Sequence, residues 1–180
     1  MKSGTVKLVT NDHHGTEHIL NIPLPGELLG FDGFSNEKYN CSAIALETLS
    51  FCQLPTKKID ELFKNISILT KELFRQSSEK TNTDKEYIVL NKTPAEESLA
   101  HFLISLSDRL KRRGFSVSKF TLSLTHQEIG NHFGLALETV SRLLTTFQQK
   151  NLILVKGKQI EIKDIAWLRA VFTDTESKLI

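Results

Sequence analysis

Apolar positions change their spacing along the chain, alternating near the N-terminus and following a helical period further on. Residues 5–10 and 17–22 form two short apolar runs around the turn-forming segment 11–15, which predicts a β-hairpin. Residues 41–54 alternate loosely between apolar and polar side chains, which predicts strands of a half-buried antiparallel sheet. The first third of the chain is therefore expected to be rich in β-structure.

Helical spacing begins after Pro55. Residues 56–64 carry apolar side chains at helical spacing, and residues 66–90 contain neither glycine nor proline, which predicts a short helix followed by a long one. Polar residues interrupt the apolar stripe of the long helix, so we expect either a weak or regulated dimer seam or a helix packed on the chain's own sheet. The candidate seam residues are Leu69, Leu73, Thr81, Asp84 and Ile88.

A further helix is predicted from Pro94 to Arg113, because proline suits a helix start and Gly114 is placed to end it. Here a second, α-rich part of the chain is expected to begin. One face of this helix carries the apolar residues Leu99, Phe102, Leu103 and Leu106.

A short helix, a glycine turn and a two-faced helix are predicted next. Thr125 and Glu128 have the spacing of a capping box, in which each side chain satisfies a backbone N–H at a helix start. Gly130 leaves room for a second helix to approach, and Gly134 suits the left-handed conformation of a sharp turn. The helix after the turn has a core face with Val140, Leu143, Leu144 and Phe147, and a free face with Glu138, Ser141, Arg142 and Thr145.

This arrangement is typical of a helix-turn-helix, whose second helix enters the major groove of DNA. Arginine can donate two hydrogen bonds to guanine, a carboxylate can accept one from cytosine, and serine can bond either kind of base edge. Glu138, Ser141 and Arg142 are therefore candidate base-reading residues. The alternative is that these side chains only solvate the outer face of a helical hairpin.

A predicted hairpin after the two-faced helix favours the DNA-binding interpretation. Residues 152–155 and 159–162 are short apolar runs that flank Lys156-Gly-Lys158. A hairpin at this place is a wing, and its two lysines would meet phosphates, which adds affinity without sequence information.

Composition narrows the function classes further. The net charge of +2 is too mild to indicate a nucleic acid by itself, and the basic run from Arg109 to Arg113 could be a solvated helix end. The six histidines show no H-E-x-x-H pattern and no phosphate-binding glycine loop is present, so we expect no enzyme. No leader-like segment and no apolar run of about 20 residues is found, which favours a cytoplasmic protein without a membrane partner.

The chain resembles the cyclic-AMP receptor and fumarate-nitrate reduction regulator (CRP/FNR) family of bacterial transcription factors, and the second branch more closely. The match covers essentially the whole chain. It is carried by Glu128-Ile-Gly-Asn, Gly134-Leu, Glu138-Thr-Val-Ser-Arg-Leu-Leu and Val155-Lys-Gly-Lys, and upstream by Pro25-Gly-Glu-Leu, Ala45-Leu-Glu-Thr and Arg113-Gly-Phe-Ser.

This resemblance implies an α+β fold in three parts. They are a partial β-roll (cupin-like) sensor domain at 1–55, connecting and dimerisation helices at 56–93, and a winged helix-turn-helix at 94–180. It also implies a homodimer that binds a palindromic operator on double-stranded DNA, contacts RNA polymerase and acts in anaerobic or redox-responsive gene control.

The same resemblance, together with the pattern, assigns two sets of surface residues. The DNA-contacting set is Thr125, Glu138, Thr139, Ser141, Arg142, Lys156 and Lys158. The polymerase-contacting set is Ser3, Gly15, Thr48, Arg113, Phe115 and Ser116, each of which could instead be only a turn or a cap.

Two departures from the family concern the signal. In the cyclic-nucleotide branch an arginine before a Ser-Ala pair holds the ligand phosphate, whereas Cys41 precedes Ser42-Ala43 here. A buried phosphate would lack its countercharge, so we expect no cyclic nucleotide.

In the oxygen-sensing branch four cysteines hold a [4Fe-4S] cluster, and Cys52 matches the fourth, while the three N-terminal ones have no counterpart here. One thiolate cannot hold such a cluster, so we expect no cofactor in the chain as given, and a [4Fe-4S] cluster only in a full-length form. The alternative for Cys52 is a small buried apolar residue. The alternative function is a truncated, signal-blind family member that acts by forming non-productive dimers.

Two further residues are expected to weaken function. Ala136 stands where the family has a threonine that caps the recognition helix, which should cost roughly 0.5–2 kcal/mol of helix stability. Asp84 would face its own copy across a dimer seam, and the repulsion between like charges would make pairing conditional.

Overall fold

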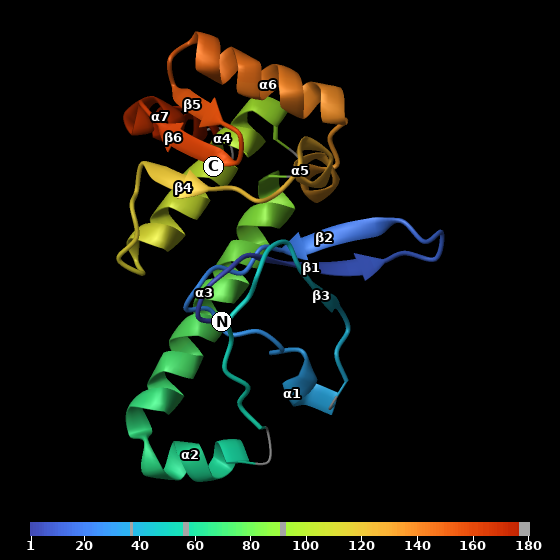
Figure 1. Cartoon of the computed structure of the whole chain (residues 1–180), viewed down its shortest axis with the longest axis vertical. Coiled ribbons are helices and arrows are strands. Elements are labelled where there is room, and N and C mark those ends of the chain that lie inside the picture. Colours follow the sequence, from blue (N-terminus) through green and yellow to red (C-terminus); the bar gives the residue numbers. More distant parts are fainter. Residues whose placement is uncertain (37, 56–57, 91–92, 177–180) are drawn as a thin grey trace. The chain divides into compact units, whose positions relative to one another are not determined.

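The computed structural model describes residues 1–36, 38–55, 58–90 and 93–176. It divides into two compact units, Met1–Val89 and Leu90–Ile180, here called the N-terminal and C-terminal units (Figure 1). Each unit combines helices with one antiparallel three-stranded sheet, so the α+β class is confirmed. The finer division at 55/56 and 93/94 stays a prediction.

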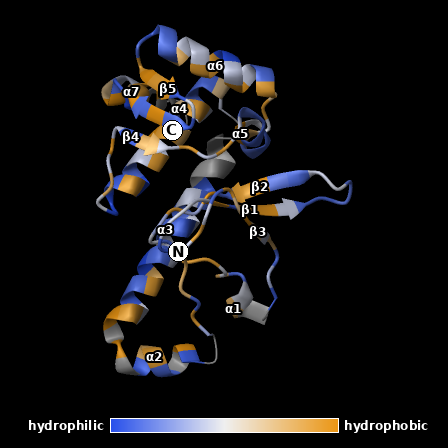
Figure 2. Cartoon of the chain, viewed as in Figure 1, coloured by the Kyte–Doolittle hydropathy of each residue, from blue (hydrophilic) through white to orange (hydrophobic). Residues whose placement is uncertain are grey.

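The N-terminal unit is built on the predicted hairpin. Strands β1 (Val6–Asn11) and β2 (Glu17–Asn21) pair antiparallel, and β3 (Ser42–Ala45) pairs with the other edge of β1, which gives the order β2-β1-β3. Figure 2 shows apolar colouring at the inner end of the hairpin and polar colouring toward its tip. The hairpin is therefore anchored at one end only.

Asp12 organises the tip of this hairpin. Its Oδ1 accepts hydrogen bonds from the backbone N–H groups of His14 (2.8 Å) and Thr16 (2.9 Å), and Gly15 takes a left-handed φ of +80°. The His18 ring bonds to Asp12 Oδ2 at 3.1 Å, and this hydrogen bond holds the pKa of the Asp12 carboxyl below its ordinary value. The turn is thus set by one aspartate and one glycine.

The prediction of strands of a half-buried antiparallel sheet over residues 41–54 holds only in part: one antiparallel strand forms, but it is not half-buried. Only Ser42–Ala45 forms a strand, and all four of its residues are exposed. Ser50 makes a single bridge with Ser3, and Phe51 is 66% exposed. The loose alternation did not produce burial, because no further layer of the described residues covers β3.

The helices of the N-terminal unit are α1 (Gly33–Asn36), α2 (Ile59–Asn65) and the long α3 (Ser67–Leu90). Two of them, α2 and α3, follow the predicted pattern closely, and α1 was not predicted. Gln76 ties α3 to its own unit, since its Oε1 accepts a hydrogen bond from the Leu28 N–H at 3.1 Å.

The C-terminal unit contains the predicted helix-turn-helix and wing. Its elements are α4 (Ala95–Lys111), β4 (Lys119–Thr121), α5 (His126–Phe133), α6 (Leu137–Gln149), β5 (Ile153–Lys156), β6 (Gln159–Ile162) and α7 (Ile165–Glu176). The sheet has the order β4-β6-β5, so β5 lies at an edge. Strand β4 and helix α7 were not predicted from the sequence.

The core of this unit collects apolar faces from all its helices. Phe102 of α4 is fully buried and meets Phe133 of α5 edge to face, with ring centroids 5.4 Å apart. Phe147 of α6 is fully buried and packs against Trp167 of α7 at 6.0 Å. Helix α7 therefore supports the recognition helix from behind.

Candidate DNA-binding interface

The turn before the recognition helix depends on two glycines. Gly134 has φ +65°, and its N–H bonds to the Gly130 carbonyl. A Cβ at Gly130 would lie 2.5 Å from the Leu135 carbonyl oxygen, so a larger residue there would push the turn open. These glycines set the angle between α5 and α6.

The first helix of the pair begins with the predicted capping box. Glu128 N–H donates to the Thr125 hydroxyl oxygen at 3.2 Å, and Thr125 N–H donates to the Glu128 carboxylate at 2.8 Å. The Thr125 hydroxyl also donates to that carboxylate at 2.9 Å. Thr125 is exposed, but its side chain is engaged in the cap.

Helix α6 begins without a side-chain cap. Ala136 is its N-cap residue and offers no acceptor for the first-turn N–H groups. The expected loss of the cap is therefore present in the structure.

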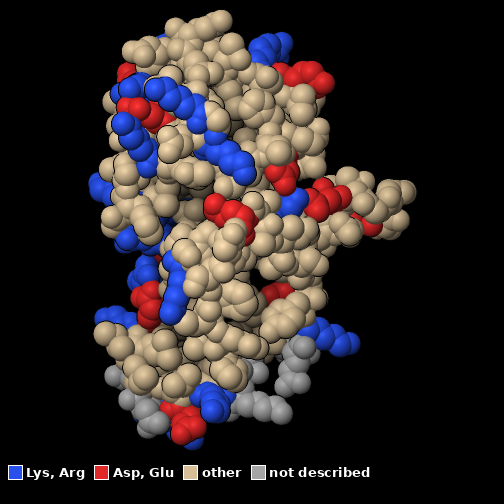
Figure 3. All heavy atoms as spheres, in the orientation of Figure 1, with Lys and Arg blue, Asp and Glu red and all other residues tan. Residues whose placement is uncertain are grey.

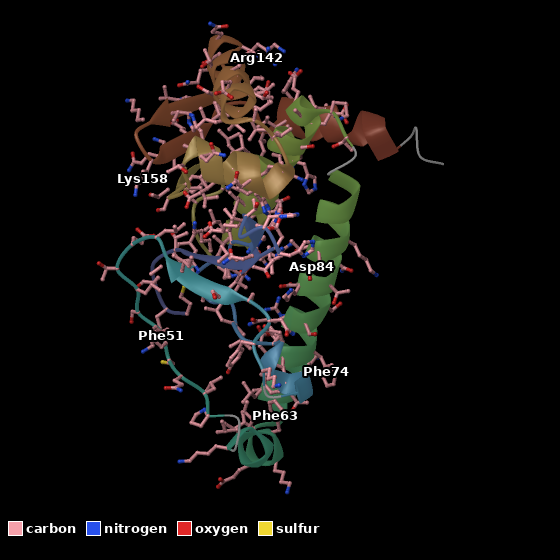
Figure 4. The ribbon with its side chains drawn as sticks, turned by 90° about the vertical axis from the view of Figure 1, so that its right-hand side faces the viewer. Phe51, Phe63, Phe74, Asp84, Arg142 and Lys158 are labelled. Atoms are coloured by element: carbon pink, nitrogen blue, oxygen red, sulfur yellow. The ribbon has the colours of Figure 1, made fainter. Side chains whose placement is uncertain are left out.

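The two faces of α6 match the predicted pattern. Val140 and Phe147 are fully buried, while Glu138 and Arg142 are exposed and Ser141 and Thr139 are half-buried. Within the described chain, neither the Glu138 carboxylate nor the Arg142 guanidinium makes a hydrogen bond or an ion pair. Figure 4 shows Arg142 extending outward from the helix.

The predicted wing is present as the β5–β6 hairpin. Lys156 pairs with Gln159, so the loop consists of Gly157, with φ +60°, and Lys158. A glycine at the first of two loop positions is typical of a type II′ turn. Lys156 and Lys158 are exposed, and Figure 4 shows Lys158 at the tip of the hairpin.

The sheet beside the wing carries further basic residues. Lys163 and Lys119 lie 2.6 Å and 3.4 Å from the Glu161 carboxylate, and the hydrogen bond from Lys163 is the main cause that lowers the pKa of Glu161. Figure 3 shows Lys and Arg atoms gathered over the hairpin, with acidic atoms among them. Two lysines against one carboxylate leave this sheet positive.

The candidate dimer residues all lie on α3 and, at its 3.6-residue repeat, follow one broad side of the helix. Leu69 and Leu73 are half-buried on the side of the helix that carries Gln76, which binds the unit's own turn. Thr81 is exposed, and the Ile88 side chain lies outside the described residues.

The outward face of α3 carries the charged residue Asp84 and the exposed aromatic residue Phe74. The Asp84 carboxylate is 44% exposed and pairs with Lys80 at 2.8 Å, so its charge is partly compensated within the helix. Phe74 is 72% exposed and points away from the helix (Figure 4). Sequence reasoning missed Phe74, although it lies one heptad before Thr81.

The candidate polymerase contacts lie on the surface loops of their units. Ser3 forms a β-bridge with Ser50, and Gly15 lies at the tip of the β1–β2 hairpin. The backbone of Gly4 lies against that of Thr48, where an added Cβ would be 2.6 Å from the Thr48 carbonyl oxygen.

In the C-terminal unit the candidate contacts follow α4. Phe115 is 50% exposed beyond Gly114, whose φ is +79°. Arg113 donates to the Arg109 carbonyl at 2.7 Å, and the Ser116 hydroxyl accepts from Lys119 N–H at 3.1 Å. Three of the candidates therefore share one loop.

Glu27 and Cys41, which a bound cyclic nucleotide would be expected to meet, make contacts within the chain. Glu27, in the Pro25-Gly-Glu-Leu segment that resembles the family, accepts a hydrogen bond with its carboxylate from the Leu24 N–H at 2.9 Å. The Cys41 thiol lies 3.6 Å from the Asp32 carboxylate, and burial, followed by that carboxylate, raises the pKa of Cys41. A carboxylate beside this position would repel a phosphate.

The two cysteines do not fit an iron–sulfur cluster. Cys52 is exposed, so its interpretation as a buried apolar residue is wrong, and Cys41 is half-buried beside Asp32. Over the described ranges no group of three or more His, Cys, Asp or Glu side chains could hold a metal ion. This chain's own residues therefore do not supply the four thiolates that the family resemblance implies.

Comparison with known protein families finds two matches that together span most of the chain. The family model of the Crp-like helix-turn-helix domain matches residues 97–171, and that of the cyclic nucleotide-binding domain matches residues 1–66. In the part that the structure describes, no helix is long and apolar enough to cross a membrane.

Curated relatives give the same result. The chain is 42% identical over 165 residues to the transcriptional activator protein Anr of Pseudomonas protegens, which covers 91% of this chain and 68% of the relative. It is 39% identical over 180 residues to the anaerobic regulatory protein of Haemophilus influenzae, covering 99% and 70%. To the fumarate and nitrate reduction regulatory protein of Yersinia pestis it is 41% identical over 165 residues, covering 91% and 66%.

Solved structures support the fold. FixK2 from Bradyrhizobium japonicum matches with a TM-score of 0.75 at 20% identity, covering 94% of this chain and 83% of that one. The identities with the relatives are high enough to assign the family, whose members are transcription regulators and not enzymes. The chain therefore belongs to the CRP/FNR family of transcription regulators, in the branch of the fumarate and nitrate reduction and Anr proteins.

Proposed function

We propose that this chain is a sequence-specific regulator that binds a palindromic operator as a homodimer and acts in anaerobic or redox-responsive gene control. The exposed face of α6 carries this proposal. Glu138, Ser141 and Arg142 project from its first two turns, and neither the Glu138 carboxylate nor the Arg142 guanidinium has a partner in the described chain. Carboxylate, hydroxyl and guanidinium groups are the kinds of side chain that read base edges in a major groove.

The wing adds the phosphate contacts that such a helix needs. Lys156 and Lys158 are exposed at the hairpin end, in the same compact unit as α6. Phosphate contacts set the register of a protein on DNA, and base contacts set the sequence. Thr125 and Thr139 belong to the same proposed surface.

The outward face of α3 supports the homodimer. Phe74 and Thr81 are exposed on it, and Asp84 lies three residues further. An aromatic side chain at 72% exposure leaves a large apolar area in water, which association would remove. A two-fold symmetric dimer would then require inverted half-sites.

The redox link rests on the named functions of the relatives and not on a cofactor site. We expect no cyclic nucleotide, because Cys41 beside Asp32 replaces the cation that would hold its phosphate. Contacts of Ser3, Gly15, Thr48, Arg113, Phe115 and Ser116 with RNA polymerase remain part of the proposal.

The test measures binding to a duplex with two inverted half-sites of the TTGAT type, the operator type that the family resemblance implies, together with the mass of the protein in solution. We expect a dimer that shifts this duplex and does not shift one with scrambled half-sites. Equal binding to both duplexes would overturn sequence-specific recognition. A dimer that binds neither duplex would instead favour the alternative, a family member that forms non-productive dimers.

A further inference from the structure

The wing meets the recognition helix through very few polar contacts. Helix α6 ends at Gln149, and Asn151 takes a left-handed φ of +54°, which reverses the chain into β5. Asparagine tolerates this conformation better than most residues. At the base of the wing, Leu152 N–H donates to the Phe147 carbonyl at 2.9 Å.

One further hydrogen bond reaches the wing nearer its tip. The Gln148 side-chain Oε1 accepts from the Val155 N–H at 3.1 Å. Strand β5 lies at the edge of the sheet, so the N–H groups on its outer side have no strand partner. Among the described residues, no other hydrogen bond joins α6 to β5 beyond Leu152.

This hydrogen bond lies between the wing lysines and the proposed base-reading residues of α6. Val155 immediately precedes Lys156 and lies three residues before Lys158. Gln148 lies six residues, less than two turns, after Arg142 on the same helix. The bond thus connects the proposed base-reading element to the proposed phosphate-contacting element.

We propose that Gln148 is a positioning residue, whose side-chain carbonyl holds the edge of β5 so that the wing lysines reach phosphates while α6 reads bases. This inference rests on the proposed DNA-binding function. Strand β4 pairs with β6 up to the hairpin end, where the Leu122 N–H donates to the Lys158 carbonyl at 2.8 Å, so the Gln148 bond constrains the edge strand β5 and Lys156 at its end. Without the bond, β5 would move more freely at this edge, and fewer bound conformations would place both elements on DNA.

The experiment compares Gln148→Met with Gln149→Met in the full chain, using fluorescence anisotropy on the TTGAT duplex. Methionine keeps the length of the side chain and removes the acceptor. Gln149 is an exposed neighbour with no hydrogen bond of its side chain in the described chain, so it is a matched control. We expect Gln148→Met to weaken operator binding by roughly two- to tenfold, the range of one hydrogen bond, and Gln149→Met to leave it unchanged.

A double-mutant cycle separates positioning from direct contact. The same Gln148→Met change is made in a chain that also carries Lys156→Ala and Lys158→Ala. If Gln148 acts by placing these lysines, its loss should cost nothing in this background. An equal loss in both backgrounds would overturn the proposal and indicate that Gln148 touches DNA or supports the fold in general.

Amide hydrogen exchange tests the bond without DNA. We expect the Val155 amide to be protected in the wild-type chain and in Gln148→Glu, which keeps an acceptor, and to exchange faster in Gln148→Met. Equal exchange rates in all three proteins would also overturn the proposal. If the wild-type chain does not prefer the operator, the proposed function fails, while the exchange result still decides whether Gln148 holds the wing.

Discussion

The two units differ in how completely they cover their own apolar side chains. In the C-terminal unit Leu99 and Phe102 of α4 and Val140 and Phe147 of α6 are fully buried. In the N-terminal unit Ile68, Phe51 and Phe74 are 75%, 66% and 72% exposed, and every residue of β3 is exposed. Most of the large exposed apolar residues that the structure describes lie in the N-terminal unit.

This difference shows which unit has a closed apolar core of its own. Helices α4, α5, α6 and α7 close a core around one another, so the geometry of the DNA-binding surface is set within its own unit. The N-terminal unit instead leaves apolar surface in water, at about 25 cal/mol for each Å² that a partner could cover. We expect mutations in the two units to act in correspondingly different ways.

The largest expected effect is the loss of a buried aromatic ring. Phe102→Ala should lower the free energy of unfolding by about 3–5 kcal/mol, because it removes a fully buried side chain and leaves a cavity. Phe51→Ala, at an exposed position, should change it by less than about 0.5 kcal/mol. Urea unfolding measures both, and similar losses would mean that the two units are equally well packed.

Substitution of Arg142 should have the next largest effect, on the affinity for DNA. Arg142→Ala should remove about 1–3 kcal/mol of discrimination between the operator and a duplex changed at one base pair of each half-site. Arg112→Ala removes the same charge from an exposed position outside the helix-turn-helix and serves as the control. Anisotropy titrations measure the two affinities. Equal discrimination in both variants would remove Arg142 from the base-reading set.

A new cap should strengthen the C-terminal unit. Ala136→Thr would offer a hydroxyl acceptor to the first-turn N–H groups of α6 and should add roughly 0.5–2 kcal/mol to the free energy of unfolding. Ala170→Thr, on an exposed position within α7, should add nothing. Thermal unfolding distinguishes the two. A gain in neither variant would show that the helix start is satisfied in another way.

The N-terminal unit should respond through association. Asp84→Ala should tighten the dimer by about 0.2–1 kcal/mol, the range of exposed charge pairs, because it removes like charges from the seam. Lys80→Ala should weaken the dimer, since it removes the partner that compensates Asp84 at 2.8 Å. Sedimentation measures both dissociation constants, and an unchanged value for Asp84→Ala would discard this role.

The smallest expected effect is a pH dependence of the C-terminal unit. Burial lowers the pKa of His101 below its ordinary value of 6.5, so the folded unit binds this proton less readily than the unfolded chain. Stability is then complete above about pH 6.5 and falls as the pH drops below it. Unfolding curves at pH 7.5 and 5.5 measure this difference. His101→Leu should reduce it, and an undiminished difference would assign it to other groups.

Much of the site could be predicted because its signals are local. The capping box at Thr125, the left-handed Gly134 and the two faces of α6 depend on residues within a few positions of one another, so a sequence pattern contains them. The wing was predictable for the same reason, since a two-residue glycine turn between apolar runs is a short-range feature.

The sequence by itself determined these local elements, the order in which they occur and the residues that could read DNA. Outside the two-faced helices, only the tertiary structure decided which apolar residues are buried, because burial depends on what the rest of the chain places above them. It left β3, Cys52 and Phe74 exposed, recruited α7 behind the recognition helix, and brought Gln148 to the edge of β5. Such contacts join elements through space, and no spacing along the chain encodes them.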